Sequence, residues 1–254
     1  MSWKKAIQKL VGRFGYRLCA FPDRIGMDPF QDMATFSHGD SPLILDVGAN
    51  TGQTVQEFRK VFCKPRIHSF EPSPATFELL RQNTSAIPDT QLWNRAMGSS
   101  SGRMILQEND DNGMSSFLPL SRFGWGSVIK QTSVDVDVVD DFCLREHIDR
   151  IDILKSDTQG YDLEVFKGAK RMFQEERIGL VYSEVIFSDM YKGMASMSQI
   201  YDFLTNHDFV LVSLYRLVYK KRLASHTDWL FAHKSCVAAL AESALIPSEV
   251  LAGR

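Results

Sequence analysis

The pattern of hydrophobic and polar positions changes period repeatedly between residues 43 and 70. Residues 43–47 form a short apolar run interrupted by one aspartate, and two glycines follow it. Apolar residues then recur at helical spacing over residues 54–62, and a second short segment, residues 66–70, ends on Glu71 and Pro72. This pattern predicts a strand, a glycine turn, a helix and a second strand, which together open a nucleotide-binding α/β sheet.

Later segments continue the alternation of strands and helices. Residues 132–139 alternate apolar and polar side chains, as a half-buried strand does. We predict further strands at residues 91–96, 103–107, 151–155, 178–186, 209–215 and 229–233, and helices at residues 75–83, 140–147, 163–172 and 196–206. The last two strands are expected to form an antiparallel pair. Ser73 is the predicted N-cap of the helix that follows, with Pro74 at its first position.

Length, charge and cysteine usage narrow the class of protein. The 254 residues suit one large α/β domain, and a net charge of −2 gives no electrostatic argument for nucleic-acid binding. No apolar run approaches the roughly 18 residues that a membrane-spanning helix needs. The four cysteines are scattered without a C-x-x-C pair, which favours free thiols in a reducing compartment over a disulfide frame or a zinc site. We therefore expect a cytoplasmic protein.

The first 40 residues differ from the rest of the chain. Basic residues and apolar residues at helical spacing share residues 3–18, which predicts a basic amphipathic helix. This helix could cap the sheet, pair with a second subunit, or rest peripherally on the inner face of a membrane. Residues 22–39 are predicted to be irregular and to lead over the ligand pocket. We divide the chain into a lead-in segment (1–40), a main domain (41–236) and a tail (237–254).

The glycine turn restricts the ligand. Its sequence, G-A-N-T-G from Gly48 to Gly52, lacks the G-x-G-x-x-G of dinucleotide sites and the G-K-[ST] of phosphate-binding loops, which bring backbone N–H groups to a phosphate. S-adenosylmethionine has an adenosine and a cationic sulfonium but no phosphate, so it fits this turn. Asp46 would face its cationic end, directly or through water, and Glu71 would accept hydrogen bonds from its two ribose hydroxyls. An ordinary βα turn and an NAD site are the alternatives.

Residues 108–126 form the least regular stretch and are rich in polar and aromatic side chains. A long loop in an α/β enzyme often covers the site and selects the substrate, and we expect that role here, with a disordered surface loop as the alternative. Asp110 and Asp111 have no further ligands at loop spacing. We interpret them as solvated acids and predict no metal site.

Two carboxylates end neighbouring predicted strands. Asp157 follows the strand at residues 151–155, at the edge of the sheet where ligands bind in such folds, and Glu184 lies near the end of the next strand. Asp157 is the first candidate for a base that takes a proton from a hydroxyl, and Glu184 is the second. Orienting the cofactor or capping the next helix are alternatives for Asp157. A magnesium ion shared with a sugar diol is chemically reasonable, although the spacing does not require it.

Two histidines, His68 and His226, are further candidates beside these carboxylates. His68 lies inside a predicted strand and is expected to be structural. His226, expected in a late loop near the same edge of the sheet, is an alternative catalytic group.

Four sequence blocks carry a resemblance to a known family. They read L-D-V-G-A-N-T-G (residues 45–52), F-E-P-S-P (70–74), N-R-A-M-G (94–98) and L-K-S-D-T-Q-G-Y-D-L-E-V-F-K-G-A (154–169). Over residues 41–234 the chain resembles the FkbM-type S-adenosylmethionine-dependent methyltransferases, and the last block is the most specific. The resemblance implies a Rossmann-like class I methyltransferase sheet of seven strands, the last one antiparallel, flanked by helices. It also implies a monomer or homodimer that methylates hydroxyls of sugars or polyketides.

The resemblance further implies which residues form the site. Those expected to bind the cofactor are Asp46, Gly48, Asn50, Thr51, Gly52, Glu71, Pro72, Ser73, Arg95 and Ala96, with Asp157 closest to the reacting methyl group. Two positions depart from the family pattern, because Gln159 and Asp162 each stand where a glutamate is usual. The absent carboxylate at position 159 weakens any argument for a metal or a base there.

The leading hypothesis is an S-adenosylmethionine-dependent O-methyltransferase acting on a hydroxyl of a sugar, glycan or related small molecule. The acceptor could be lipid-linked if the N-terminal helix contacts a membrane. Methyl transfer to nitrogen or to protein is one alternative, but N-methyltransferases often carry [ND]-P-P-[YF] where this chain has S-D-T-Q. A non-catalytic S-adenosylmethionine-binding domain is another. Gln159 leaves it open, whereas the glycine turn and Glu71 count against it.

Overall fold

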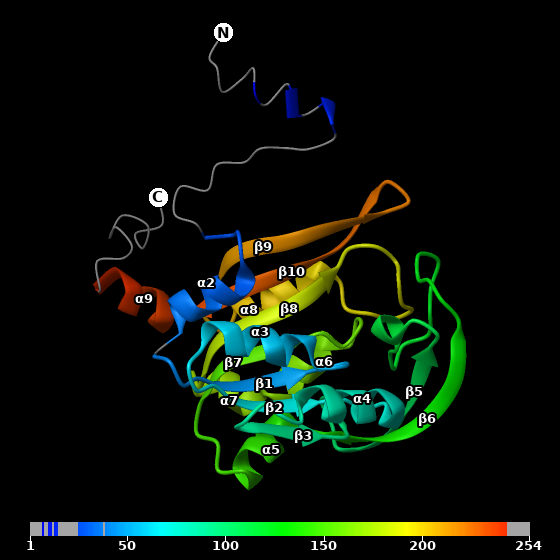
Figure 1. The fold of residues 1–254 in the computed structure, drawn as a ribbon, viewed down its shortest axis with the longest axis horizontal. Coiled ribbons are helices and arrows are strands. Elements are labelled where there is room, and N and C mark those ends of the chain that lie inside the picture. Colours follow the sequence, from blue (N-terminus) through cyan, green and yellow to red (C-terminus); the bar gives the residue numbers. More distant parts are fainter. Residues whose placement is uncertain (1–6, 8–9, 12, 15–24, 38, 243–254) are drawn as a thin grey trace.

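The computed structural model describes residues 7, 10–11, 13–14, 25–37 and 39–242. Seven strands form one sheet in the order β3-β2-β1-β7-β8-β10-β9, and β10 runs opposite to the other six strands (Figure 1). The strands are β1 (Leu43–Val47), β2 (Arg66–Phe70), β3 (Thr90–Trp93), β7 (Ile151–Ser156), β8 (Ile178–Ile186), β9 (Phe209–Lys220) and β10 (Leu223–His233). The predicted class I methyltransferase sheet, with its last strand antiparallel, is confirmed.

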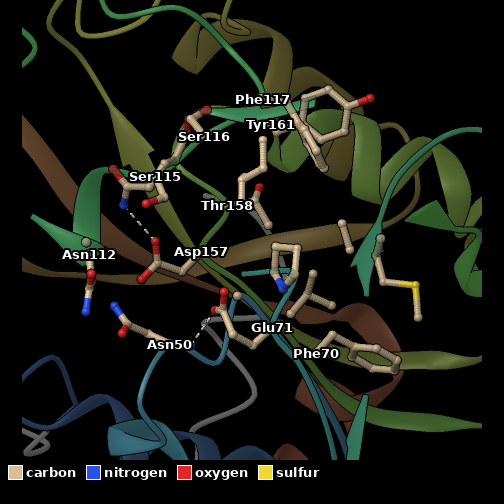
Figure 2. Close-up of a pocket in the computed structure, with 18 residues that line it drawn as sticks. Asn50, Phe70, Glu71, Asn112, Ser115, Ser116, Phe117, Asp157, Thr158 and Tyr161 are labelled. Carbon is tan, nitrogen blue, oxygen red and sulfur yellow. Dashed lines mark hydrogen bonds between the residues drawn. The ribbon is translucent and has the colours of Figure 1, made fainter. Parts of the chain in front are cut away.

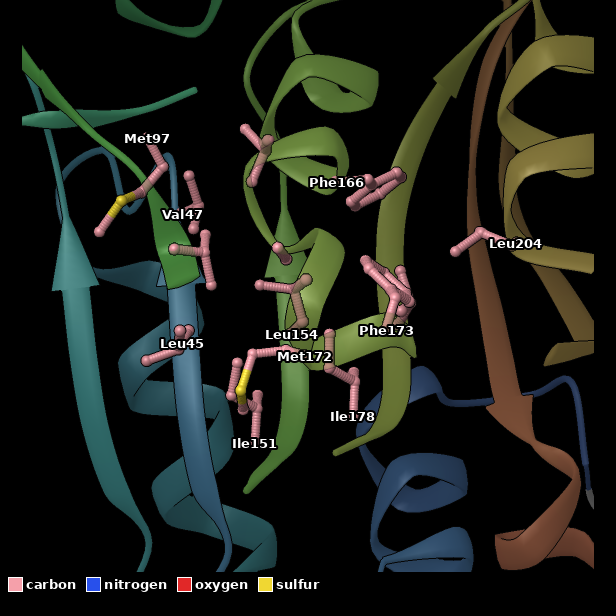
Figure 3. Close-up of a cluster of buried hydrophobic side chains, with 14 of the residues drawn as sticks. Leu45, Val47, Met97, Ile151, Leu154, Phe166, Met172, Phe173, Ile178 and Leu204 are labelled. Carbon is pink, nitrogen blue, oxygen red and sulfur yellow. The ribbon is translucent and has the colours of Figure 1, made fainter. Parts of the chain in front are cut away.

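Helices cover both faces of this sheet. They are α2 (Pro29–Phe36), α3 (Gln53–Val61), α4 (Pro74–Thr84), α5 (Val139–Arg145), α6 (Asp162–Gly168), α7 (Lys170–Gln174), α8 (Met197–Thr205) and α9 (Lys234–Glu242). The strands alternate their side chains between two cores, as the period of two requires. Leu45 and Val47 of β1 pack with Phe166 and other side chains of α5 to α8 (Figure 3), whereas Ile44 packs with α2, α3 and α9.

A second, three-stranded sheet begins directly after β3 in the chain. It consists of β4 (Ala96–Met97), β5 (Gly102–Asn109) and β6 (Val128–Asp137), in the order β4-β6-β5. The strand predicted at residues 91–96 is therefore split between two sheets. The division falls at a tight turn, where the N–H of Arg95 donates to the carbonyl of Trp93 at 2.9 Å. The long connection from β5 to β6 contains a short 3-10 helix, η1 (Asn112–Met114), and returns to the edge of the main sheet (Figure 1).

The prediction for residues 22–39 is wrong in its described part. Residues 29–36 form α2, which begins with Asp28 as N-cap and Pro29 at its first position. This helix packs against α3, α9 and β10, and it does not contribute to the cavity described below. The predicted helix at residues 3–18 lies largely outside the described residues, and the predicted boundary at residue 236 falls within α9. In the part of the chain that the structure describes, no helix has the length and apolar character to span a bilayer.

Candidate functional site

A cavity lies at the carboxyl edge of the sheet, over the ends of β1, β2 and β7. It encloses about 650 Å³ including the open space at its mouth. Figure 2 shows Asn50, Glu71, Asp157 and Asn112 around this space. Because β2 and β7 flank β1, the ends of three adjacent strands provide one side of the cavity, and the β5–β6 connection provides the other.

The glycine turn after β1 can form only with glycine at its first position. Gly48 has φ +75°, and a Cβ atom there would lie 1.9 Å from the carbonyl oxygen of Asp157. Asn50, also left-handed at φ 48°, lines the cavity. Thr51 and Gly52 do not line it: the carbonyl of Thr51 accepts a hydrogen bond from Asn83, and Gly52 precedes the first residue of α3. These two residues shape the turn.

Glu71, at the end of β2, holds the turn and faces the cavity. Its Oε2 accepts the N–H of Asn50 at 3.0 Å, and its Oε1 accepts the N–H of Ser73 at 2.9 Å. Burial raises the pKa of Glu71 to about 7, and the two backbone bonds and the charge of Lys155 offset this only in part. A carboxylate has about four lone-pair sites. The two backbone bonds therefore leave room for two further donors, which matches the vicinal diol of a ribose.

Asp46 lies behind the cavity wall. It is fully buried, and its Oδ1 lies 3.0 Å from Nζ of Lys155, which is also buried. Burial would lower the pKa of Lys155, but the charges of Asp46 and Asp157 more than compensate and raise it. The same ammonium donates to the carbonyl of Gly48 at 2.6 Å. The ion pair thus fixes the glycine turn, and a direct contact between Asp46 and a ligand is not part of this geometry.

The remaining predicted cofactor residues divide into two groups. Pro72 and Ala96 line the cavity. Ser73 caps α4, as predicted, by accepting the N–H of Thr76, and it is not in the cavity wall. Arg95 is also absent from the wall, because its guanidinium pairs with Asp137 at 2.9 Å.

Gln159 joins the two candidate catalytic carboxylates. Its Nε2 donates to Oδ1 of Asp157 and to Oε2 of Glu184, each at 3.0 Å, and its Oε1 accepts the hydroxyl of Tyr191 at 2.8 Å. The residue has left-handed backbone geometry, with φ 54°. The structure therefore brings Asp157 and Glu184 together through an amide. Asp157 lines the cavity, whereas Glu184 lies behind Gln159.

The surroundings of Glu184 favour its neutral form. Burial, followed by the charges of Asp157 and Asp228, raises the pKa of Glu184 well above its usual value. Asp228 is its cross-strand neighbour on β10, and burial and Asp157 raise the pKa of Asp228 to about 6. His226 Nε2 lies 3.6 Å from Glu184 Oε1, and burial lowers the pKa of this histidine. Burial thus favours the neutral form of both Glu184 and His226.

His226 and His68 lie in different strands and have different surroundings. His226 belongs to strand β10 and not to a loop, which corrects the prediction of its local structure, although it does lie at the expected edge. His68 is buried in β2 and stacks on Trp93, so the predicted structural role is confirmed.

The β5–β6 connection covers the cavity, as predicted for residues 108–126. Asn112, Ser115, Ser116 and Phe117 line the wall, and the hydroxyl of Ser116 donates to the backbone carbonyl of Gln159 at 2.8 Å. Met114 packs with Tyr191 in a small separate core. The sequence did not identify Ser116 or Tyr191, because each acts on Gln159 across 43 and 32 residues respectively. Among the described residues, no group of three or more His, Cys, Asp or Glu side chains is arranged to hold a metal ion.

Comparison with known proteins identifies related sequences. A family model described as the methyltransferase FkbM domain matches residues 46–211. The chain is 26% identical over 180 residues to 2-O-methyltransferase NoeI of Sinorhizobium fredii, covering 66% of this chain and 73% of that protein. It is 25% identical over 147 residues to hexuronic acid methyltransferase AglP of Haloferax volcanii, covering 56% of each. It is 27% identical over 213 residues to methyltransferase sdnD of Sordaria araneosa, covering 71% of this chain and 76% of that protein.

Proposed function

Because the chain belongs to the methyltransferase FkbM family, and is thus an S-adenosylmethionine-dependent methyltransferase, we propose that it transfers a methyl group to a hydroxyl of a sugar or glycan. NoeI, named for 2-O-methylation, and AglP, named for a hexuronic acid, support this class of acceptor. The observation that carries the proposal is the position of Glu71 and Asp157, which face one cavity from the ends of the two strands that flank β1.

The cofactor end of the cavity is formed by residues that suit a nucleoside. When bound, S-adenosylmethionine supplies an electrophilic methyl group on a sulfonium. Glu71 would accept the ribose hydroxyls through the two acceptor sites that its backbone bonds leave free. The turn at Gly48 allows the backbone to approach a ligand closely. Pro72 and Ala96 line the same cavity. The Asp46–Lys155 pair would act indirectly, by holding the turn in place.

Asp157 would take the proton of the acceptor hydroxyl as the new oxygen–carbon bond forms. Gln159 holds its Oδ1, and its Oδ2 makes no hydrogen bond within the described chain, so one oxygen is oriented while the other is available. Glu184 is less suited to accept the proton, because it lies behind Gln159 and its burial favours the neutral form by raising its pKa. It would instead help to orient Asp157 through Gln159. The acceptor could be free or joined to a lipid, and the enzyme a monomer or a homodimer.

Methyl transfer from radiolabelled S-adenosylmethionine to a panel of sugars tests the proposal. Asp157→Asn should lower kcat by about 10²–10⁴-fold, the usual contribution of a general base, with little change in cofactor affinity. Glu71→Ala should weaken cofactor binding by about 1–3 kcal/mol. Asp149→Asn, at a fully exposed carboxylate, is the matched control. Equal losses of turnover and cofactor affinity in Asp157→Asn would assign Asp157 to binding, and wild-type enzyme that methylates no sugar would overturn the acceptor class.

A further inference from the structure

The β9–β10 hairpin extends beyond the sheet at the edge that holds the cavity. β8 pairs with β10 only as far as Ile186 opposite His226, so the hairpin continues past its neighbour as a two-stranded ribbon (Figure 1). Large apolar side chains on this ribbon are exposed: Leu217 by 48%, Tyr219 by 62% and Leu223 by 55%. These residues do not contribute to either main core.

The same ribbon concentrates positive charge. Arg216, Lys220, Lys221 and Arg222 are exposed, and none of them forms an ion pair with a carboxylate of the described residues. Lys220 Nζ lies 4.3 Å from the ring centroid of Trp125, and Lys221 Nζ lies 5.8 Å from that of Phe123. These rings contact the cations without neutralising their charge.

The two residues at the turn of the hairpin are basic, although their backbone geometry is unfavourable for most L residues. Lys221 and Arg222 form a two-residue turn, and both have positive φ, at 49° and 68°. Such a turn strongly favours Asn-Gly, since most L residues rarely adopt this geometry. The backbone geometry of the turn therefore does not account for the two charged residues.

We propose that the tip of this hairpin, residues 216–223, is a contact surface for a membrane with anionic headgroups. Exposed leucine and tyrosine side chains beside lysine and arginine are the composition of an interfacial segment, in which apolar groups enter the headgroup region and cations bind anionic lipid. A negatively charged acceptor in solution would account for the cations but not for the three exposed apolar side chains. This surface is independent of the proposed acceptor class.

The contact would also bring the cavity edge towards the lipid. Trp125, which lies under Lys220, stacks on His226 with the ring centroids 6.2 Å apart, and His226 contacts Glu184. The hairpin tip, the covering loop and the buried carboxylates are thus connected at one edge of the sheet. A membrane bound at the tip would lie beside the cavity and not behind it.

Sedimentation with phosphatidylcholine vesicles, with and without phosphatidylserine, tests the proposal on the full chain. Lys221→Asn/Arg222→Gly removes two cations and installs the preferred turn residues, so the melting temperature should stay the same or rise. Binding to phosphatidylserine vesicles should weaken about 25-fold, because each basic residue near an anionic surface contributes a factor of about five. The control is Lys64→Gln/Arg66→Gln, which removes two exposed cations at the opposite edge of the sheet. Equal binding by the turn variant and the wild type would overturn the proposal.

A local probe separates the hairpin from the basic N-terminal segment. An environment-sensitive dye on Leu223→Cys, in a Cys19→Ser/Cys63→Ser background, should shift its emission to the blue when phosphatidylserine vesicles are added. The same dye on Leu144→Cys, at a comparably exposed position on α5, should not respond. No shift at position 223 while the chain is vesicle-bound would refute the contact. If the turn variant lost turnover with a sugar in solution, without vesicles, the tip would bind the acceptor instead.

Discussion

The protonation state of Glu71 should control cofactor affinity near neutral pH. Burial raises its pKa from an ordinary 4.5 to about 7 in the free protein. Hydroxyl donors on both oxygens would favour the carboxylate form, so the ligand should bind the ionised protein and lower this pKa. Affinity should therefore be constant above pH 7 and fall as the pH drops below it. The expected loss is about tenfold, or ~1.4 kcal/mol, for each pH unit below 7.

Titration calorimetry with S-adenosylmethionine at pH 8, 7 and 6 measures this dependence. Buffers with different ionisation enthalpies should show proton release on binding at pH 6 and much less at pH 8. Glu71→Gln is the control, because it should bind more weakly at pH 8 but lose the pH dependence that depends on the carboxylate. An affinity that is equal at pH 8 and pH 6, or a slope that persists unchanged in the variant, would refute the role of Glu71.

The same pKa has the opposite consequence for folding. A carboxyl group whose folded pKa exceeds its unfolded pKa destabilises the protein when it is ionised. For Glu71 this cost is present above pH 7 and disappears as the pH falls towards 4.5. The free protein should therefore gain stability from Glu71 over the pH range in which the cofactor loses affinity, and the two trends distinguish ligand binding from general unfolding.

Three further substitutions test other contacts. Lys155→Met would leave Asp46 buried and unpaired, and should lower the free energy of unfolding by about 3–5 kcal/mol; a loss below about 1 kcal/mol in urea denaturation would contradict the ion pair's role. Gly48→Ala would put a methyl group 1.9 Å from the carbonyl of Asp157, so cofactor affinity should drop, and an unchanged Kd would show that the turn adapts. Gln159→Glu would add a third carboxylate to the pair it bridges, so its melting temperature should fall more steeply than that of the wild type between pH 5.5 and 8; parallel pH profiles would argue against the bridge.

The elements with a strong local signal were predictable from the sequence. The predicted strands at residues 66–70 and 178–186 have the bounds of β2 and β8, and residues 178–186 are mostly apolar. Ser73 and Pro74 were correctly placed at the start of α4. The α2 helix was missed although Asp28 and Pro29 form a similar start signal. The helix has only eight residues and follows an irregular sequence, so its helical periodicity is weak.

The site was predictable in its position and less so in its contacts. The ends of β1, β2 and β7 meet at one edge in any parallel sheet of this type, so Glu71 and Asp157 could be placed on one cavity. The ion pair between Asp46 and Lys155 joins side chains of two different strands, β1 and β7. The sequence alone does not show that these two side chains lie close together. The bridging role of Gln159 likewise depends on Glu184, 25 residues away. Side-chain contacts between different strands decide which polar residues face the ligand and which support the wall of the cavity.

A crystal structure with S-adenosylhomocysteine tests the central claim most directly. We expect the ribose hydroxyls of the ligand to donate to the carboxylate of Glu71, and its sulfur to lie on the side of the cavity that Asp157 lines. A ligand bound elsewhere, or a cavity that stays empty at saturating ligand, would contradict the account.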